Sequence, residues 1–121
     1  MDSSGWLAYF ADEFNAKHFI IPLNDFGALV VPTVTIYEVI KVILRESCEN
    51  DALQAFAAMQ KGTVVDLNAS LAIAASKLSL EHNLPMADSI ILATAREFNA
   101  ILWTQDSDFK NISNVKFFPR K

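Results

Sequence analysis

The segment Leu84–Phe109 constrains the fold most, because it places a helix, a short strand and several acids in direct succession. Pro85 suits a first helical turn, where its missing N–H would have no partner. From Met86, one helical face carries Asp88, Ile91, Leu92, Ala95 and Phe98. We expect the solvent side of this helix to carry Ser89, Ala93, Arg96 and Glu97. Asn99 then favours a helix end, and the apolar run Ala100–Trp103 predicts a strand.

The rest of the chain alternates helix and strand patterns, with turn residues between them. The predicted helices reach Phe10, cover about Phe14–Ile21 until Pro22, run from Thr33 or Thr35 through Leu44, and cover Asn50–Lys61 and Asn68 to about Glu81. The other predicted strands are Ala28–Val31, Thr63–Asp66 and Val115–Phe118. We expect a core position for Phe14, Phe56, Phe98 and Trp103. Alternation of this kind predicts a single α/β domain over residues 1–121, with helices on both faces of a parallel sheet.

Composition narrows the functional classes. Hydrophobic residues make up 52% of the 121 positions, which is typical of a packed globular chain. The formal net charge of −4 argues against a protein that binds nucleic acid through bulk positive charge. A lone Cys48 excludes an intramolecular disulfide and fits a reducing cytosol, so we expect a cytoplasmic protein. No apolar run reaches the roughly 18 residues of a membrane span, and no signal peptide is visible.

Four carboxylates lie just after a predicted strand or early in the helix that follows it: Asp2, Glu38, Asp88 and Asp106. Such positions converge at one edge of a parallel sheet, where like charges repel and raise one another's pKa. A hard divalent cation such as Mg²⁺ removes that penalty and prefers oxygen ligands. Three of these acids also have an ordinary structural interpretation. Asp2 would cap a helix, Glu38 would pair with Lys41 on a surface, and Asp88 would favour the helix dipole.

Four motifs in succession resemble PIN-domain ribonucleases of the VapC toxin type. They are Asp2–Ser4 (DSS), Val31–Val39 (VPTVTIYEV), Leu84–Ala95 (LPMADSIILATA) and Leu102–Phe109 (LWTQDSDF). The resemblance covers nearly the whole chain. It implies a three-layer α/β/α sandwich with a central parallel sheet and a Mg²⁺- or Mn²⁺-dependent endoribonuclease. It also implies a homodimer and inhibition by a cognate antitoxin.

The resemblance also assigns roles to individual residues. Asp2, Asp88 and Asp106 would hold the metal, and Glu38 would hold metal or orient the attacking water. Asp108 matches an accessory acid, while Ser4 and Thr104 match polar positions that line the same pocket.

Two features of the chain bear on these expectations. The family has a hydrophobic first strand, normally central in the sheet, before the position of Asp2. Only Met1 precedes Asp2 here, so we expect the first strand to be truncated. Contacts to RNA phosphates would come from Lys41, Arg45 and Lys110, although exposed cations are common on any surface.

Two alternative functions remain open at the level of sequence. A catalytically inactive PIN-like module would act only through a protein partner. An aspartate-based phosphatase would use the Asp106-x-Asp108 pair after a strand, although that motif normally opens a chain and is followed by Thr. Metal titration distinguishes the first alternative from a nuclease, and a covalent phosphoaspartate would identify the second.

Overall fold

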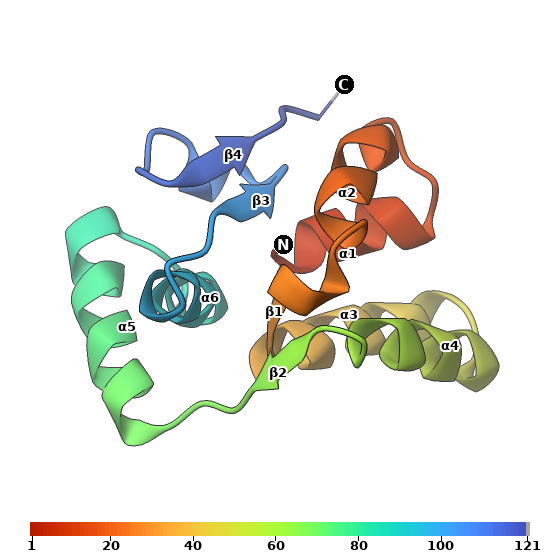
Figure 1. The fold of residues 1–121 in the computed structure, drawn as a ribbon, viewed down its shortest axis with the longest axis horizontal. Helices are drawn as coiled ribbons and strands as arrows, with labels where there is room; N and C mark the ends of the chain where they lie inside the picture. Colours follow the sequence, from red (N-terminus) through yellow and green to blue (C-terminus); the bar gives the residue numbers. More distant parts are fainter. Residues whose placement is uncertain (121) are drawn as a thin grey trace.

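Helices and short parallel strands alternate along the chain in the computed structural model, which describes residues 1–120 (Figure 1). The helices are α1 (Ser3–Phe10), α2 (Ala16–Leu23), α3 (Thr33–Glu46), α4 (Glu49–Met59), α5 (Ala69–His82) and α6 (Met86–Glu97). The strands are β1 (Val30–Pro32), β2 (Thr63–Val65), β3 (Leu102–Thr104) and β4 (Val115–Phe117). Short 3₁₀ turns cover Phe26–Ala28 and Ser107–Phe109. The predicted α/β class is confirmed. None of the helices within residues 1–120 is long and apolar enough to span a membrane.

The strands form two parallel pairs, whereas the sequence predicts one continuous central sheet. β1 pairs with β2, and β3 pairs with β4. Thr63 N donates to Leu29 O, and Leu102 N donates to Asn114 O, so each pair begins with an ordinary ladder bond. Met1 and Asp2 lie between the pairs without forming a strand, and the Asp2 backbone N–H donates to Trp103 O at 3.2 Å. The sheet is split because no strand in the described chain bridges β1 and β3.

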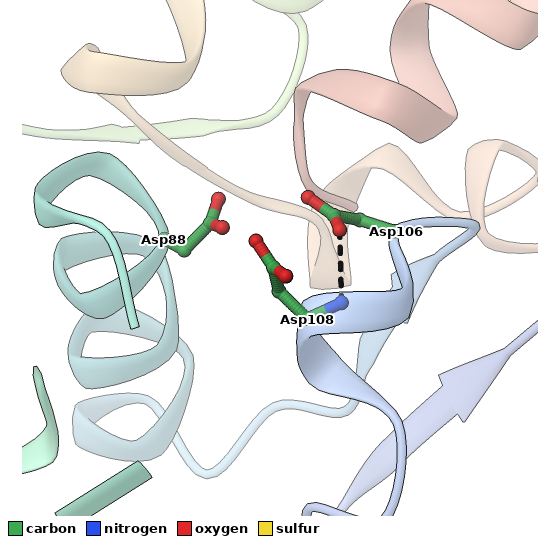
Figure 2. A group of neighbouring side chains, drawn as sticks. All are labelled: Asp88, Asp106 and Asp108. Atoms are coloured by element: carbon green, nitrogen blue, oxygen red, sulfur yellow. Dashed lines mark hydrogen bonds between the residues drawn. The ribbon is translucent and has the colours of Figure 1, made fainter. Parts of the chain in front are cut away.

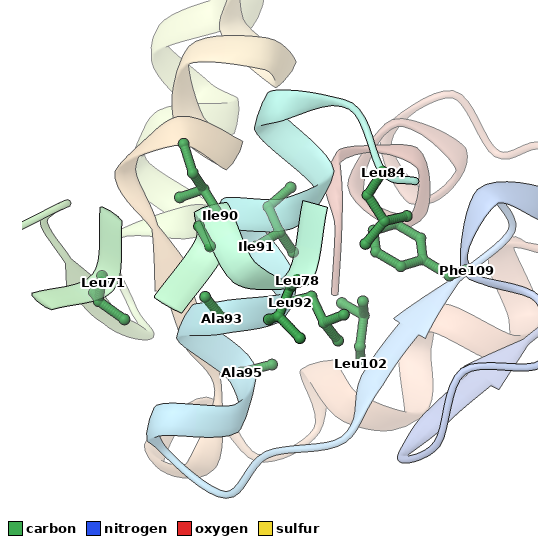
Figure 3. Close-up of a cluster of buried hydrophobic side chains, with 11 residues drawn as sticks. Leu71, Leu78, Leu84, Ile90, Ile91, Leu92, Ala93, Ala95, Leu102 and Phe109 are labelled. Carbon is green, nitrogen blue, oxygen red and sulfur yellow. The ribbon is translucent and has the colours of Figure 1, made fainter. Parts of the chain in front are cut away.

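Two apolar clusters form the core. One surrounds α6, where α5, β3 and Phe109 pack against Ile91 and Leu92 (Figure 3). The other joins α1, α2 and β1 around Trp6, Phe19 and Val31. Gly62 lets the chain pass close to β1, because a Cβ at this position would lie 2.9 Å from the Leu29 carbonyl oxygen.

Burial of α6 differs from the prediction. Every residue from Asp88 to Ala95 is buried, including Ser89 and Ala93, which the helical pattern assigned to solvent. The helix is enclosed because α5 covers it on one side while α3 and β1 contact it on others. Phe98 lies beyond the end of the helix and is 46% exposed, so its predicted core position is wrong.

Helix ends follow local chemistry with one exception. Asn68 caps α5 by accepting a hydrogen bond from Leu71 N, and Asn83 and Asn99 both take positive φ at helix ends. Pro22, however, lies inside α2 instead of ending it. A proline lacks the N–H that would bond the carbonyl four residues earlier, and α2 ends one residue later at Leu23.

Exposure also corrects some predicted core positions elsewhere. Phe14 is exposed beside the Lys17 ammonium. Phe56 and Trp103 are half-buried. Helices α2 and α3 also leave apolar side chains exposed, among them Ile20, Ile21 and Leu44, so each helix buries a narrower face than its apolar residues suggest.

Truncating Phe19 tests the second core cluster. This side chain is fully buried, packs on Gly5 and meets the Phe118 ring edge-on. We expect Phe19→Ala to lower the free energy of unfolding by about 3–5 kcal/mol, because it leaves a cavity. The neighbouring Ile20, which is 45% exposed on the same helix, provides the control. Ile20→Ala should cost less than about 1 kcal/mol in the same urea titration. Equal losses in both variants would contradict this description of the core.

Candidate metal centre

Three aspartates converge at the carboxyl edge of the strands. Asp88 lies in the first turn of α6, Asp106 follows β3, and Asp108 lies in the 3₁₀ turn Ser107–Phe109. One carboxylate oxygen from each lies within 4.8 Å of the others, and the three side chains point toward one another (Figure 2). Within residues 1–120 this is the only such group of potential metal ligands, and it contains oxygen ligands alone.

Backbone geometry after β3 orients two of these acids. Thr104 Oγ1 accepts a hydrogen bond from Asp106 N at 2.9 Å, and Asp106 Oδ1 accepts one from Asp108 N at 2.9 Å (Figure 2). The second bond is an Asx turn, which reverses the chain and brings Asp108 back toward Asp106. Opposite them, Pro85 begins α6 with extended ψ, so Asp88 falls in the first turn and faces the loop.

Asp2 caps α1, as its position suggested, and its second oxygen bonds to the residue that ends β3. Its Oδ1 atom caps α1 by accepting from Gly5 N at 3.2 Å, and accepts from Ser4 Oγ at 2.7 Å. Its Oδ2 atom accepts from Thr104 Oγ1 at 2.8 Å. Burial raises the pKa of the Asp2 carboxyl, while the hydrogen bonds from Ser4, Thr104 and Gly5 oppose that rise. The side chain is only 1% exposed, so these bonds hold the carboxyl in one orientation.

Glu38 approaches the site from α3. Its Oε1 atom accepts a hydrogen bond from Ser3 Oγ at 2.9 Å, which links α3 to the start of α1. Glu38 lies outside the group of three aspartates whose oxygens are within 4.8 Å. The sequence did not predict the contact of Ser3 with Glu38. The one feature that could have indicated it is the position of Ser3 next to Asp2 at the start of a helix.

The charge of the cluster acts most strongly on Asp88. Burial raises the pKa of this carboxyl to about 8, and repulsion from Asp106, Asp2, Glu38 and Asp108 adds to the effect, in that order. These four neighbours are therefore close enough to couple electrostatically to Asp88. These carboxylates offer oxygen ligands alone, and a hard divalent cation prefers such ligands and would offset their repulsion. Structural zinc sites instead use cysteine sulfur and histidine nitrogen, which this cluster lacks.

Two buried amide side chains, Asn15 and Gln105, hold the loop that carries Asp106. Asn15 Nδ2 donates to Gln105 Oε1 and to the carbonyls of Phe118 and Pro119, each at 3.1 Å. Gln105 N donates in turn to Ser4 Oγ at 3.2 Å. The residues that precede Asp106 are thereby tied to α1 and to the C-terminal segment. Sequence reasoning missed both amides, because neither belongs to a recognisable motif.

The three cations proposed for RNA contact have different surroundings. The Lys41 ammonium lies 5.5 Å from the centre of the Tyr37 ring, and Arg45 pairs with Glu46 at 3.2 Å, both on exposed surface. Lys110 follows the Asp108 turn and has no ion pair among the described residues. Position therefore favours Lys110 as a cation near the acidic cluster.

Replacing Asp88 tests the electrostatic repulsion. With a folded-state pKa of about 8, the folded chain retains a proton on Asp88 that the unfolded chain releases near pH 4. The contribution of Asp88 to the stability of the metal-free protein is therefore lost as pH rises from about 4 to about 8. Asp88→Asn cannot titrate and removes this pH dependence. The free energy of unfolding of Asp88→Asn, minus that of the unchanged chain, should therefore be larger at roughly pH 8 than at roughly pH 5.

Urea unfolding in EDTA at both pH values measures this difference. The control is Asp66→Asn, which changes an exposed acid outside the cluster. A pH profile of Asp88→Asn identical to that of the unchanged chain would contradict the raised pKa.

Comparisons with known proteins agree with this architecture. The chain matches the PIN domain family over residues 1–115. A chain from a toxin–antitoxin complex of Klebsiella pneumoniae is 21% identical, with a TM-score of 0.81, and the match covers 98% of this chain and 96% of that one. VapC20 of Mycobacterium tuberculosis, described as a toxin that cleaves the sarcin–ricin loop, is 16% identical with a TM-score of 0.75. That match covers 93% of this chain and 92% of VapC20.

A search of curated proteins returns no match. The two structural likenesses concern the fold, whereas the family match spans nearly the whole sequence and includes the positions of all the clustered acids. The chain belongs to the PIN domain family.

Proposed function

We propose that this chain is a Mg²⁺- or Mn²⁺-dependent endoribonuclease that hydrolyses RNA phosphodiester bonds and acts as the toxin of a toxin–antitoxin system. The observation that carries the proposal is the convergence of Asp88, Asp106 and Asp108 within 4.8 Å, in a chain of the PIN domain family. The family match favours this reaction over that of an aspartate-based phosphatase.

The metal would be held by Asp2, Asp88 and Asp106, with Asp108 as an accessory ligand. Bound at this edge, a divalent cation supplies an activated water and stabilises the leaving oxygen of an in-line displacement. Asp88 would give up its proton when the cation binds, because its raised pKa comes from burial and from repulsion that a cation offsets. Thr104 and Ser4 would keep Asp2 oriented through their hydrogen bonds to its two oxygens. Glu38, held by Ser3, would bind the metal or orient the attacking water.

An RNA substrate would need cations at the rim of this acidic site. Lys110 is the first candidate because it directly follows the turn that carries Asp108. Lys41 and Arg45 on α3 are the others, and they lie one and two turns beyond Glu38. Single-stranded RNA is the expected form, since its phosphodiesters are not held in a duplex.

Removing a ligand tests the metal site and the reaction together. We expect Asp106→Asn to weaken Mn²⁺ binding by at least about 100-fold. Replacing a residue that only hydrogen-bonds to a metal ligand already lowers metal affinity about 10–100-fold, and Asp106 would be a ligand itself. Hydrolysis of RNA in Mg²⁺ or Mn²⁺ should fall with it. Isothermal titration of the EDTA-stripped protein measures the binding, and a fluorescent single-stranded RNA measures the cleavage.

Asp66→Asn is the matched control, because it removes an exposed acid without touching the cluster. Full activity of Asp106→Asn would overturn the assignment of the site. Metal binding without hydrolysis of any RNA tested would instead identify an inactive module that acts through its partner.

Protein partners follow from the proposed function. We propose an antitoxin that inhibits the enzyme, and a homodimer of the chain itself. The structural likeness to a chain in a toxin–antitoxin complex supports the first. Exposed apolar side chains on α3 and α4, including Tyr37, Leu44 and Leu53, offer a surface that a partner helix would cover.

A charge on this surface tests the antitoxin contact. We expect Leu53→Lys to weaken the complex with the proposed antitoxin by at least about tenfold, because burying an unpaired charge is costly. Leu80→Lys on α5 alters another exposed leucine and should leave the affinity unchanged. Equal affinity of both variants, measured by surface plasmon resonance, would place the antitoxin on another surface.

A further inference from the structure

Asn15 and Gln105 are the only buried asparagine or glutamine side chains within residues 1–120. Asn15 directly precedes α2 and is 2% exposed, and Gln105 directly precedes Asp106 and is 5% exposed. Burying an amide is costly unless its polar atoms are hydrogen-bonded. The Asn15 side chain makes no capping bond to α2, although it holds the cap position. Helix capping therefore does not explain why an amide is buried there.

The hydrogen bonds of Asn15 join two other segments of the chain. Its Nδ2 atom donates to Gln105 Oε1, in the loop after β3, and to the carbonyls of Phe118 and Pro119, which follow β4. One turn further along α2, the His18 ring stacks on the Phe118 ring with centroids 4.3 Å apart. The start of α2 thus holds the segment after β4 by two kinds of contact, and it holds Gln105 against that segment.

From Gln105 the hydrogen bonds continue to Asp2. Gln105 N donates to Ser4 Oγ at 3.2 Å, and Gln105 Nε2 donates to Ser4 O at 3.4 Å. Ser4 Oγ in turn donates to Asp2 Oδ1 at 2.7 Å. A hydroxyl carries one hydrogen, so the bond to Asp2 leaves the Ser4 oxygen able to accept from Gln105. Asn15 is thereby connected to the Asp2 carboxylate through Gln105 and Ser4.

A second set of bonds holds the residue after Gln105 in the same way. Asp106 N donates to Thr104 Oγ1 at 2.9 Å, and Thr104 Oγ1 donates to Asp2 Oδ2 at 2.8 Å. The consecutive N–H groups of Gln105 and Asp106 therefore bond the two hydroxyls that hold the two oxygens of Asp2. A displacement of the loop at Gln105 would move the Asp106 carboxylate and loosen Asp2 at the same time.

We propose that Asn15 is a positioning residue of the metal centre, which acts through Gln105 to fix the separation of Asp2 and Asp106. Metal ligands must be held within about 0.5 Å of the productive geometry, and the residues that hydrogen-bond around them supply this order. The side-chain bonds of Asn15 reach neither acid directly. This inference rests on the proposed function, because it requires that these two acids bind the cation.

Removing the amide of Asn15 tests this role. Leucine resembles asparagine in shape but donates no hydrogen bond, so Asn15→Leu leaves Gln105 without its partner. We expect Asn15→Leu to weaken Mn²⁺ binding by at least about tenfold, because residues that orient metal ligands contribute about 10–100-fold to affinity. Isothermal titration of the EDTA-stripped protein with Mn²⁺ measures the Kd. A Kd equal to that of the unchanged chain would overturn the inference.

A loss of stability must be distinguished from a loss of positioning. Asn68→Ala removes the cap of α5, where the Asn68 side chain accepts from Leu71 N, and it lowers Tm without altering the bonds around Asp2. We expect Asn68→Ala to bind Mn²⁺ as tightly as the unchanged chain, at a temperature at which both are folded. A weakening in Asn68→Ala equal to that in Asn15→Leu would mean that only stability matters, and would overturn the inference.

A double variant tests whether Asn15 acts through Gln105. Gln105→Met preserves the length of the side chain and removes its amide. Added to Gln105→Met, Asn15→Leu should weaken Mn²⁺ binding by less than about twofold further, because effects that pass through one shared contact are not additive. Additive losses would overturn this inference and leave the proposed function intact. An unchanged chain that binds no Mn²⁺ would overturn the proposed function, and this inference with it.

Discussion

Repulsion among carboxylates at one edge of the strands is the constraint on which the site depends. Burial and four neighbouring acids raise the pKa of Asp88 to about 8, so the folded chain holds these groups together against their electrostatic preference. Packing elsewhere offsets this cost. Asp88 is carried by α6, whose apolar residues are enclosed by α5, α3 and β1, and the helix cannot turn away without exposing that core.

Hydrogen bonds fix the orientation of the acidic side chains, which the packing of the helices and strands alone would not fix. Thr104 is central, because its hydroxyl donates to Asp2 and accepts from the Asp106 backbone. Residues 102 positions apart in the chain are thereby joined through one side chain. Asn15 and Gln105 extend the same network to the C-terminal segment. A single buried hydroxyl thus connects the cap of α1 with the loop that carries two of the three clustered aspartates.

Sequence patterns predicted much of this arrangement. The order of helices and strands, the start of α5 at Asn68 and the end of α6 near Asn99 follow from local propensities and turn chemistry, which act within a few residues. Positions of the acids relative to the strands were also readable, because parallel strands share a carboxyl edge. The solvent side of α6 was predicted wrongly, since periodicity describes one buried stripe and cannot show that neighbouring elements enclose a helix from several directions. Ser3, Asn15 and Gln105 were missed for a related reason: their partners are remote in sequence.

The sequence by itself determined the class of fold, the acids that follow each strand and the preference for oxygen ligands, because these depend on residue type and local spacing. Only the tertiary structure decided that Asp88, Asp106 and Asp108 meet within 4.8 Å, and that Glu38 is held by Ser3 instead of joining that group. Tertiary structure also decided that β1 and β3 stand apart as edges of two separate pairs. Contacts of this kind depend on how whole elements pack against one another, and no local pattern of residues records that packing.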